Sequence, residues 1–173
     1  ERLGKLAAEL LDLSRLDAGV ELRSELVELV ELSRSVLAEF EVGDSRAELS
    51  AEAPTWVRAD PGAIARITRI LLHNAHSHGG PDGRIVVRVD PTESAIEVTD
   101  AGPGVPPGEE EQIFERFQRG PDAGEDGGFG LGLAIGRELA QKMGGALTLE
   151  PSDRGARFRA TFLRADEDAE PEA

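Results

Sequence analysis

Two stretches decide how this chain folds: Ile96-Glu-Val-Thr-Asp-Ala-Gly-Pro-Gly-Val105 and Gly128-Phe-Gly-Leu-Gly-Leu133. In the first, an alternating, strand-like run stops at Asp100, and Gly102 and Gly104 follow directly. We therefore expect a carboxylate at the end of a strand, where glycines let the backbone approach a flat ligand such as a purine. In the second stretch, glycines lead into an apolar helical pattern. A helix N-terminus with free amide N–H groups favours phosphate.

The composition limits the classes of partner. The 173 residues include 19 Lys and Arg against 34 Asp and Glu, which gives a formal net charge of −15. This charge disfavours nucleic acids and anionic membranes, because both need a cationic face. The absence of cysteine excludes disulfides and thiolate metal sites. No run approaches the ~20 apolar residues of a membrane span. Because the chain starts at Glu1, inside a helical pattern, we expect any membrane segment to lie outside it.

Apolar spacing predicts four helices. The first ends at Asp17-Ala-Gly19. Ser24 is predicted to cap a second one that buries residues from Leu26 to Phe40 and ends at a turn at Gly43-Asp44. Asp60-Pro61 starts a third helix, which runs to Gly79-Gly80. The fourth spans 131–143. The apolar stripe of the first helix has the spacing of a bundle and consists of Leu3, Leu6, Leu10 and Leu13.

Alternating residues predict strands between these helices, and Trp56 is expected to fill the core. Residues 101–130 form a long connection with one short helical piece at 110–117. A connection of this length inside a compact domain is usually functional or mobile. The strand-like runs are 47–52, 55–59, 84–89, 95–99, 146–150 and 156–163.

Asn74 stands at the end of an apolar helical stripe, where its amide needs partners. Those partners are either protein groups or a bound ion, because an amide oxygen is a hard ligand that Mg2+ accepts. His78 lies near the same line of the helix and could donate to phosphate or cap the helix end. His76 points the opposite way, so the two histidines cannot share a metal ion.

Other candidates also allow two interpretations. Asp100 can accept a hydrogen bond from an exocyclic amine, which selects adenine over guanine, or it can simply form a turn before glycine. Arg116 and Arg119, which surround Phe117, could reach a terminal phosphate or could be solvated surface charges. Each motif alone is weak evidence, and the order of the motifs along the chain is more specific.

That order resembles the catalytic, ATP-binding domain of sensor histidine kinases, in the GHKL ATPase superfamily. The leading segment Leu10–Gly19 resembles the end of the second helix of the dimerisation and phosphoacceptor hairpin. The remaining motifs are similar to the N box (73–78), the first glycine box (98–105), the F box (113–117), the second glycine box (128–133) and the closing glycine element (155–158).

The resemblance implies an α/β two-layer sandwich of the Bergerat type, with a mixed sheet packed on helices and an N-terminal helix from a helical hairpin. Residues 1–19 would be the end of hairpin helix 2, and 20–164 would be the catalytic ATP-binding domain. Residues 165–173 form an acidic tail that we expect to be disordered. ATP would lie between the layers under a mobile lid.

The resemblance also implies the roles of individual residues. Asp100 would bind the adenine amine, Asn74 would bind Mg2+, His78 would lie near the phosphates and Arg119 would approach the terminal phosphate. The implied reaction transfers the γ-phosphoryl group of ATP to a histidine of the hairpin in a cytoplasmic homodimer, and then to a response regulator. The further nucleotide-binding residues would be Ala75, Gly102, Gly104, Phe114, Phe117, Gly128, Gly130, Leu131 and Gly132.

Three residues depart from the family pattern. Ile70 stands where hydrolysing relatives keep a glutamate base, so use of ATP for hydrolysis is disfavoured. Ser77 replaces a basic residue, and Phe129 replaces a small one. The leading helix carries no histidine in a His-Glu or His-Asp context, so the phosphate acceptor lies elsewhere. Two alternatives remain: a degenerate nucleotide-binding module that transfers nothing, and an anti-sigma-type serine kinase.

Overall fold

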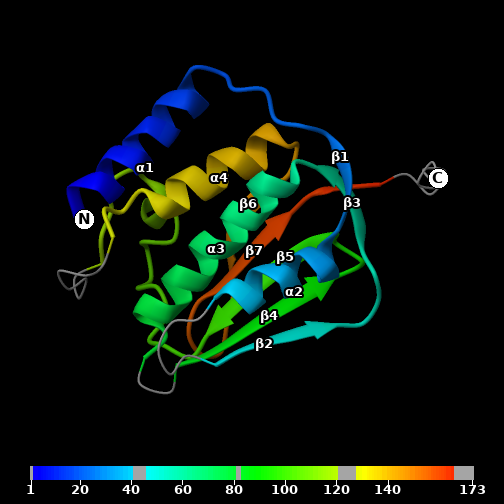
Figure 1. Ribbon diagram of the computed structural model, residues 1–173. Helices are drawn as coiled ribbons and strands as arrows, with labels where there is room; N and C mark the ends of the chain where they lie inside the picture. The colour runs from blue at the N-terminus through cyan, green and yellow to red at the C-terminus, as the bar shows by residue number, and fades with distance from the viewer. Residues whose placement is uncertain (1, 41–45, 81–82, 121–127, 166–173) are drawn as a thin grey trace.

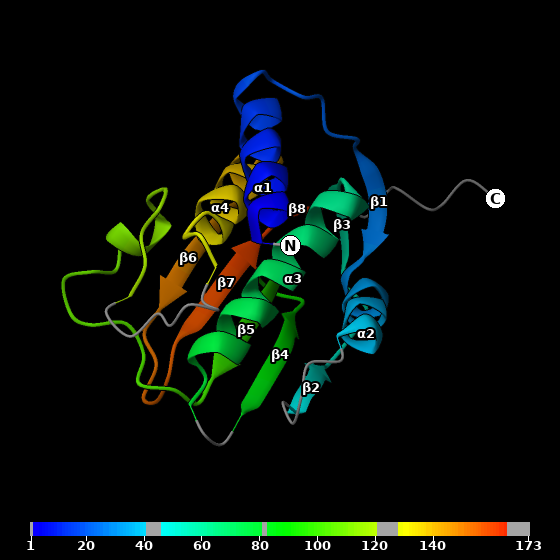
Figure 2. The same ribbon diagram turned by 60° about the vertical axis from the view of Figure 1, so that its left-hand side comes forward.

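The computed structural model describes residues 2–40, 46–80, 83–120 and 128–165. In chain order the elements are α1 (Arg2–Asp17), β1 (Glu25–Glu28), α2 (Leu29–Glu39), β2 (Arg46–Ala51), β3 (Trp56–Ala59), α3 (Pro61–His78), β4 (Arg84–Asp90), β5 (Ala95–Asp100), the short 3-10 helix η1 (Gln112–Phe114), α4 (Gly132–Lys142), β6 (Ala146–Glu150), β7 (Arg157–Thr161) and β8 (Leu163–Arg164). Helices α2, α3 and α4 cover one face of a sheet (Figure 1). Helix α1 lies across α3 and α4, on the side away from the sheet (Figure 2).

The main sheet is mixed and has the strand order β2-β4-β5-β7-β6. Strands β2 and β4 are parallel, and the other neighbours are antiparallel. Val87, Val98 and Phe158 occupy one cross-strand row and are at most 2% exposed, so this row belongs to the core. A second sheet, of order β1-β3-β8, stands at one end. The predicted α/β sandwich is confirmed.

Helix α3 begins where the sequence predicts. Asp60 is the N-cap and its Oδ1 accepts a hydrogen bond from the amide of Ala63 at 3.1 Å, while Pro61 takes the first helical position. The apolar stripe of α3 is at most 1% exposed at Ile64 and Ile67. Local capping and the apolar face therefore specify this helix together.

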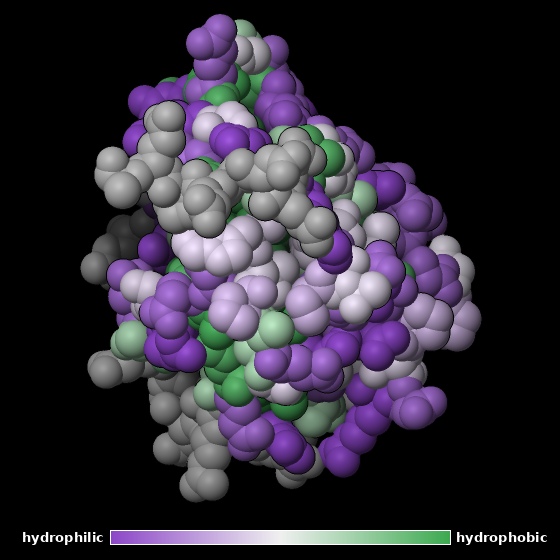
Figure 3. Space-filling view, turned by 90° about the vertical axis from the view of Figure 1, so that its right-hand side faces the viewer, coloured by the Kyte–Doolittle hydropathy of each residue, from purple (hydrophilic) through white to green (hydrophobic). Residues whose placement is uncertain are grey.

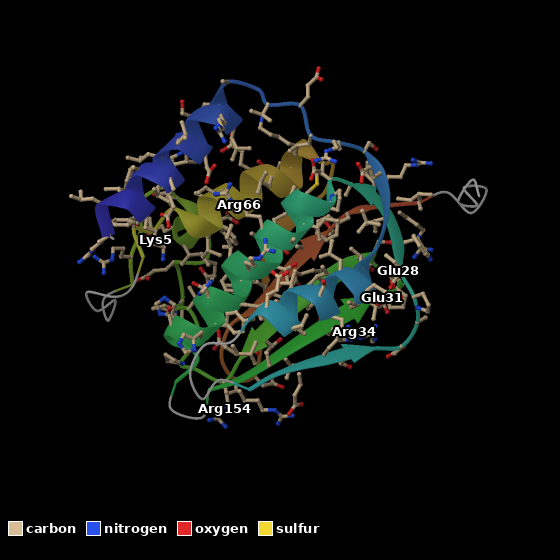
Figure 4. All side chains as sticks on the ribbon, viewed as in Figure 1. Lys5, Glu28, Glu31, Arg34, Arg66 and Arg154 are labelled. Atoms are coloured by element: carbon tan, nitrogen blue, oxygen red, sulfur yellow. The ribbon has the colours of Figure 1, made fainter. Side chains whose placement is uncertain are left out.

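The predicted start of the second helix is wrong. Residues 25–28 form strand β1, which pairs with β3, and the helix starts at Leu29. The N-cap is Glu28, not Ser24, and its carboxylate accepts from the amides of Val30 at 3.0 Å and Glu31 at 2.9 Å. Glu28 and Glu31 lie together at this helix start in Figure 4. Residues 25–28 form a strand because they pair with β3, and the local sequence carries no information about that partner.

The prediction that Trp56 fills the core is also wrong, because Trp56 is 48% exposed. Along β3 the side chains alternate, and Val57 and Ala59 take the buried face. A shift of one residue in a strand exchanges its two faces, so the pairing with β1 decides which residue is buried.

The side of the molecule shown in Figure 3 is mainly polar, with a narrow apolar strip.

The predicted helical piece at 110–117 is reduced to η1. Predictions for the turn at Gly43-Asp44, for part of the long connection (121–127) and for the acidic tail (166–173) lie outside the described residues. Ala165, predicted to belong to the tail, is instead held to β3, because its amide donates to the carbonyl of Trp56 at 3.1 Å. Within the described ranges, no helix is long and apolar enough to cross a membrane.

Candidate functional site

Asp100 ends β5 with its carboxylate held by two backbone amides. Its Oδ1 accepts from the amide of Gly102 at 2.8 Å and from that of Ala156 at 3.2 Å. The amide of Asp100 donates in turn to the carbonyl of Ala156 at 3.0 Å. The residue is only 5% exposed, and within the described ranges no hydrogen bond to Oδ2 is found. This second oxygen is therefore held in place and can accept from a ligand N–H.

Two glycines allow three backbone segments to meet around Asp100. A Cβ on Gly102 would lie 1.9 Å from the carbonyl oxygen of His78, at the end of α3. A Cβ on Gly155 would lie 1.9 Å from the carbonyl oxygen of Asp100, and Gly155 also has a φ of +72°. No side chain fits at such separations. The loop after β5, the end of α3 and the turn between β6 and β7 are therefore in direct contact.

Asn74 lies on α3 between two parts of the site. On one side, Ile70 packs against the start of α4, where its Cγ2 would be 3.3 Å from a Cβ on Gly132. On the other side, a Cβ on Gly79 would be 3.6 Å from the Cβ of Asp100. Asn74 is partly exposed, and its side chain makes no hydrogen bond to the described part of the chain. Its amide is thus available between the carboxylate and the glycine-rich helix start, beside the buried Ala75.

The start of α4 supplies amide groups that lack helical partners. Leu131 is the N-cap, and its carbonyl accepts from the amide of Ile135 at 2.9 Å. No side chain of the described residues caps this end. Among the described residues these first-turn N–H groups therefore have no side-chain acceptor, and they carry the positive end of the helix dipole. Leu131 is fully buried, which anchors this helix start in the core.

Phe114, predicted to contact the nucleotide, lies in the core. It is 7% exposed and packs edge-on against Phe158, with 6.1 Å between ring centroids. The guanidinium of Arg137, from α4, lies 4.7 Å from the centre of the Phe114 ring and also pairs with Glu111 at 2.9 Å. We call residues 109–118 the F-box arm. Phe114 and Arg137 together fasten this arm to α4 and β7.

The end of the F-box arm is tied to the second glycine box. The amide of Phe117 donates to the carbonyl of Gly130 at 2.8 Å. A Cβ on Gly130 would lie 2.3 Å from the carbonyl oxygen of Gln118, and Gly130 has a φ of +73°. Phe117 itself has a φ of 65° and is 60% exposed. An exposed aromatic held in a strained conformation beside a candidate site is a common functional feature.

The two arginines of the predicted phosphate region have different surroundings. Arg116 pairs with Asp17 of α1 at 2.7 Å and with Glu138 of α4 at 3.5 Å. Arg119 is exposed, two residues beyond the bond between Phe117 and Gly130.

The first two glycines of the second glycine box differ in their surroundings. Gly128, unlike Gly130, has open space beside it, since no atom of the described residues lies within 4 Å of the position that a Cβ would take. A side chain is therefore tolerated at Gly128 and excluded at Gly130, so two glycines of one motif have different structural requirements.

All three histidines belong to α3. His73 and His76 face Phe40 edge-on, at centroid distances of 5.5 and 6.4 Å. Burial lowers the pKa of His73, and the charges of Lys5 and His76 lower it further. These two histidines serve the contact between α2 and α3. His78 is exposed in the last turn of α3, beside the loop that follows Asp100.

A cavity of about 550 Å³ opens beside the loop that follows Asp100. Its walls are the first glycine box, Gly102–Val105, and the β6–β7 turn, with Glu110 from the F-box arm. Asp100 and Asn74 do not line it. The cavity adjoins the carboxylate without including it.

The donor set fits a metal ion that arrives with phosphate. The described residues include no group of three or more His, Asp or Glu that could hold a metal by itself. A Mg2+ ion commonly keeps several waters and takes one or two protein ligands together with substrate phosphates. The amide oxygen of Asn74, one helical turn after the Ile70 that contacts the start of α4, matches that requirement.

A model of the family described as histidine kinase-, DNA gyrase B-, and HSP90-like ATPases matches residues 59–166. The chain belongs to this ATPase family. Two curated relatives are the signal transduction histidine-protein kinase/phosphatase MprB of Mycobacterium sp. (strain KMS), 36% identical over 159 residues, and that of Mycobacterium ulcerans (strain Agy99), 33% identical over 167 residues. The matches cover 90% and 94% of this chain but 31% and 32% of those proteins. The chain thus spans about a third of their length.

Solved structures agree with this membership. The mycobacterial sensor histidine kinase MprB has a TM-score of 0.67 and 28% identity, covering 82% of this chain and 99% of that one. Full-length ShkA in complex with AMPPNP has a TM-score of 0.75 and 27% identity, covering 92% of this chain and 36% of that one. The predicted resemblance to the ATP-binding catalytic domain of sensor histidine kinases is confirmed.

Sequence reasoning missed several residues around the site. Ala156 was placed in the closing glycine element, but not as a partner of Asp100. Arg137, Glu138 and Asp17 were not predicted to take part, because charged residues on helices are usually solvated. Only the packing of α1, α4 and the F-box arm brings them together, and no local signal in the sequence points to it.

Proposed function

We propose that the chain binds Mg-ATP and positions its γ-phosphoryl group for transfer to a histidine, as the catalytic part of a sensor histidine kinase. The observation that carries the proposal is the arrangement around α3. A carboxylate held by two amides adjoins one end of the helix, and an uncapped helix start adjoins its middle. Between them stands the available amide of Asn74. This sequence of acceptor, metal ligand and phosphate donors follows the order of groups along ATP.

Each residue has a role in the proposal. Oδ2 of Asp100 accepts from the exocyclic amine of adenine, and Gly102 and Gly104 allow the base to approach the backbone. Asn74 is the protein ligand of Mg2+, which neutralises phosphate charge when it is bound. The further nucleotide contacts come from Ala75, Phe117, Gly128, Gly130, Leu131 and Gly132, and Phe114 acts by holding the arm.

His78 and Arg119 are proposed to lie near the phosphates and to stabilise the charge of the transferring group. Phosphoryl transfer needs little covalent chemistry from the protein, so positioning and charge neutralisation supply most of the rate. The attacking nitrogen comes from an acceptor histidine. Residues 1–19 contain no histidine, so the acceptor belongs to another segment of the hairpin.

Transfer is favoured over hydrolysis by the residue one helical turn before Asn74. A hydrolytic enzyme needs a base there to activate water, and this chain has Ile70. Its aliphatic side chain packs against Gly132 and Gly136, which supports a structural role. The partners that follow from this function are the hairpin of the same protein in a homodimer and a response regulator, in the cytoplasm where ATP is present.

Binding of a fluorescent ATP analogue, measured with and without Mg2+, tests the nucleotide site. We expect Asp100→Asn to weaken binding roughly 10- to 100-fold and to reduce the preference for adenine, because a charge-assisted hydrogen bond is worth about 1.5–3 kcal/mol. Asn74→Ala should remove most of the magnesium dependence. Asp90→Asn is the matched control. Asp90 is also buried and also binds two backbone amides, but those belong to Thr92 and Glu93 in the turn after β4.

If Asp100→Asn and Asp90→Asn bind equally well, the adenine assignment is wrong. Incubation with labelled ATP and an added hairpin domain then tests transfer. Acid-labile label on the hairpin supports a histidine kinase, whereas acid-stable label supports a serine kinase. Binding without any label supports the degenerate module, which Ser77 and Phe129 would explain.

A further inference from the structure

We propose that Asp17, the last residue of α1, is a positioning residue that keeps Arg116 away from the terminal phosphate while α1 is docked. Release of Asp17 would make the Arg116 guanidinium available to the γ-phosphate of ATP. The inference rests on the proposed function, because it concerns the same nucleotide site. It links the helix that precedes the catalytic domain to the F-box arm through one ion pair.

The geometry of that pair is bidentate. Nη2 of Arg116 donates to Oδ1 of Asp17 at 2.7 Å, and Nη1 donates to Oδ2 at 3.2 Å. The hydrogen bond with Arg116 holds the pKa of Asp17 below its usual value, and the pKa of Arg116 is raised in return. Bidentate contacts of this kind orient a guanidinium as well as neutralise it. Arg116 is thus already occupied by carboxylates, since Glu138 lies 3.5 Å away on α4.

Docking of α1 determines where Asp17 stands. Leu13 and Leu16, about one turn or less before Asp17, are 4% and 5% exposed and belong to the core cluster of the domain. Asp12 adds an ion pair with Arg66 of α3 at 2.5 Å. Figure 4 labels Arg66 on this side of α3. When these apolar contacts are lost, Asp17 must leave Arg116, because Asp17 and the two leucines belong to the same helix.

The position of Arg116 in the chain connects the loss of the Asp17 ion pair to the nucleotide site. It is adjacent in sequence to Phe117, whose amide binds Gly130 of the second glycine box. The opposite end of the arm stays fixed through Arg137, which contacts both Phe114 and Glu111. Loss of Asp17 therefore frees one side chain while the arm keeps its anchor. Glu138 alone makes a longer, weaker contact with that side chain.

The expected effect is small and specific. Both side chains of the pair are about half exposed, and exposed ion pairs shift equilibria by about two- to five-fold at most. Asp17→Asn should therefore tighten ATP-analogue binding about two- to five-fold. Binding of ADP should stay the same, because ADP lacks the terminal phosphate. The double variant Asp17→Asn/Arg116→Gln should bind ATP as the unmodified chain does, because the released group is missing.

Asp12→Asn is the matched control. It also removes one acidic partner of α1, but its arginine belongs to α3 and not to the F-box arm. We expect the ratio of ATP to ADP affinity to change only with Asp17→Asn. Melting temperatures of the variants check that each one folds.

Failure of the proposed function and failure of this inference are distinguishable. If the unmodified chain binds neither nucleotide, the proposed function fails and this inference fails with it. If it binds ATP, but Asp17→Asn and Asp12→Asn give the same ATP to ADP ratio, only the role of Asp17 is refuted. A double variant that keeps the tighter ATP binding would also refute it, because the effect would not depend on Arg116.

Discussion

Replacing Gly102 by alanine should damage both the fold and the nucleotide site. A Cβ at this position would lie 1.9 Å from the carbonyl oxygen of His78, whereas a tolerable contact is at least 3.0 Å. The loop must therefore move by about 1 Å, since neither backbone can give way locally. That displacement stretches the hydrogen bond from the Gly102 amide to Asp100, now 2.8 Å.

The magnitude follows from these two effects. Overpacking costs about 1–3 kcal/mol, and loss of one hydrogen bond costs about 0.5–1.5 kcal/mol. We expect Gly102→Ala to lower the free energy of unfolding by roughly 2–4 kcal/mol. For a chain of this size the melting temperature should fall by roughly 5–15 °C. Affinity for an ATP analogue should fall about tenfold or more, because the Asp100 carboxylate loses its orientation.

Calorimetry and analogue titration measure the two quantities, and Gly128→Ala is the control for stability. Gly128 belongs to the other glycine box, but in the part of the chain that the structure describes no atom lies within 4 Å of its Cβ position. Its replacement should therefore change the free energy of unfolding by no more than about 0.5 kcal/mol. The reasoning is refuted if Gly102→Ala melts and binds as the unmodified chain does. It is also refuted if the two variants lose the same stability.

Three further predictions concern stability. Asp60→Ala should cost about 1–2 kcal/mol at pH 7, because an N-cap is lost. Burial opposes ionisation of Asp60, but amide hydrogen bonds from Arg23 and Ala63 hold its pKa below the usual value. Its contribution is therefore present above the unfolded pKa and is lost as the pH falls through the lower folded pKa. Denaturation at pH 7 and in acid should show that the difference in unfolding free energy between the unmodified chain and Asp60→Ala becomes smaller in acid. A difference that stays constant would contradict this prediction. Phe114→Leu should lower the free energy of unfolding, measured by urea denaturation, by about 1–3 kcal/mol, because the ring contacts with Phe158 and Arg137 are lost. Equal stability of the two chains would show that these contacts are unimportant. Leu16→Ala should weaken the docking of α1 by about 2–5 kcal/mol. Hydrogen exchange should then increase in residues 2–17 but not in α3, and an equal increase in both would show that α1 is part of one cooperative core.

Much of the fold was predictable because its signals are local. Asp60-Pro61 marks the start of α3 through capping and a fixed φ, both of which act within a few residues. The end of α4 was equally clear, because Gly144 adopts a φ of +78° after the helix. Around the site, the strand end at Asp100 and the glycine-rich helix start were both in the expected places.

The failures share one physical cause. Residues 25–28 and Trp56 were misjudged because the pairing of β1 with β3 depends on residues far away in the sequence. The packing of Phe114 against Phe158 and Arg137 was likewise not predicted, because those partners lie far away in the sequence. Local propensity carries no information about such partners.

By itself, the sequence determined the class of fold, the order of the motifs and the residue types that a nucleotide site requires. These depend on backbone preferences and on apolar periodicity, which act over a few residues. Only the tertiary structure decided which oxygen of Asp100 is already used, and that α1 pairs with the F-box arm through Asp17. Hydrogen bonds and ion pairs form between groups that packing brings within about 3 Å, and that distance is set by the whole fold.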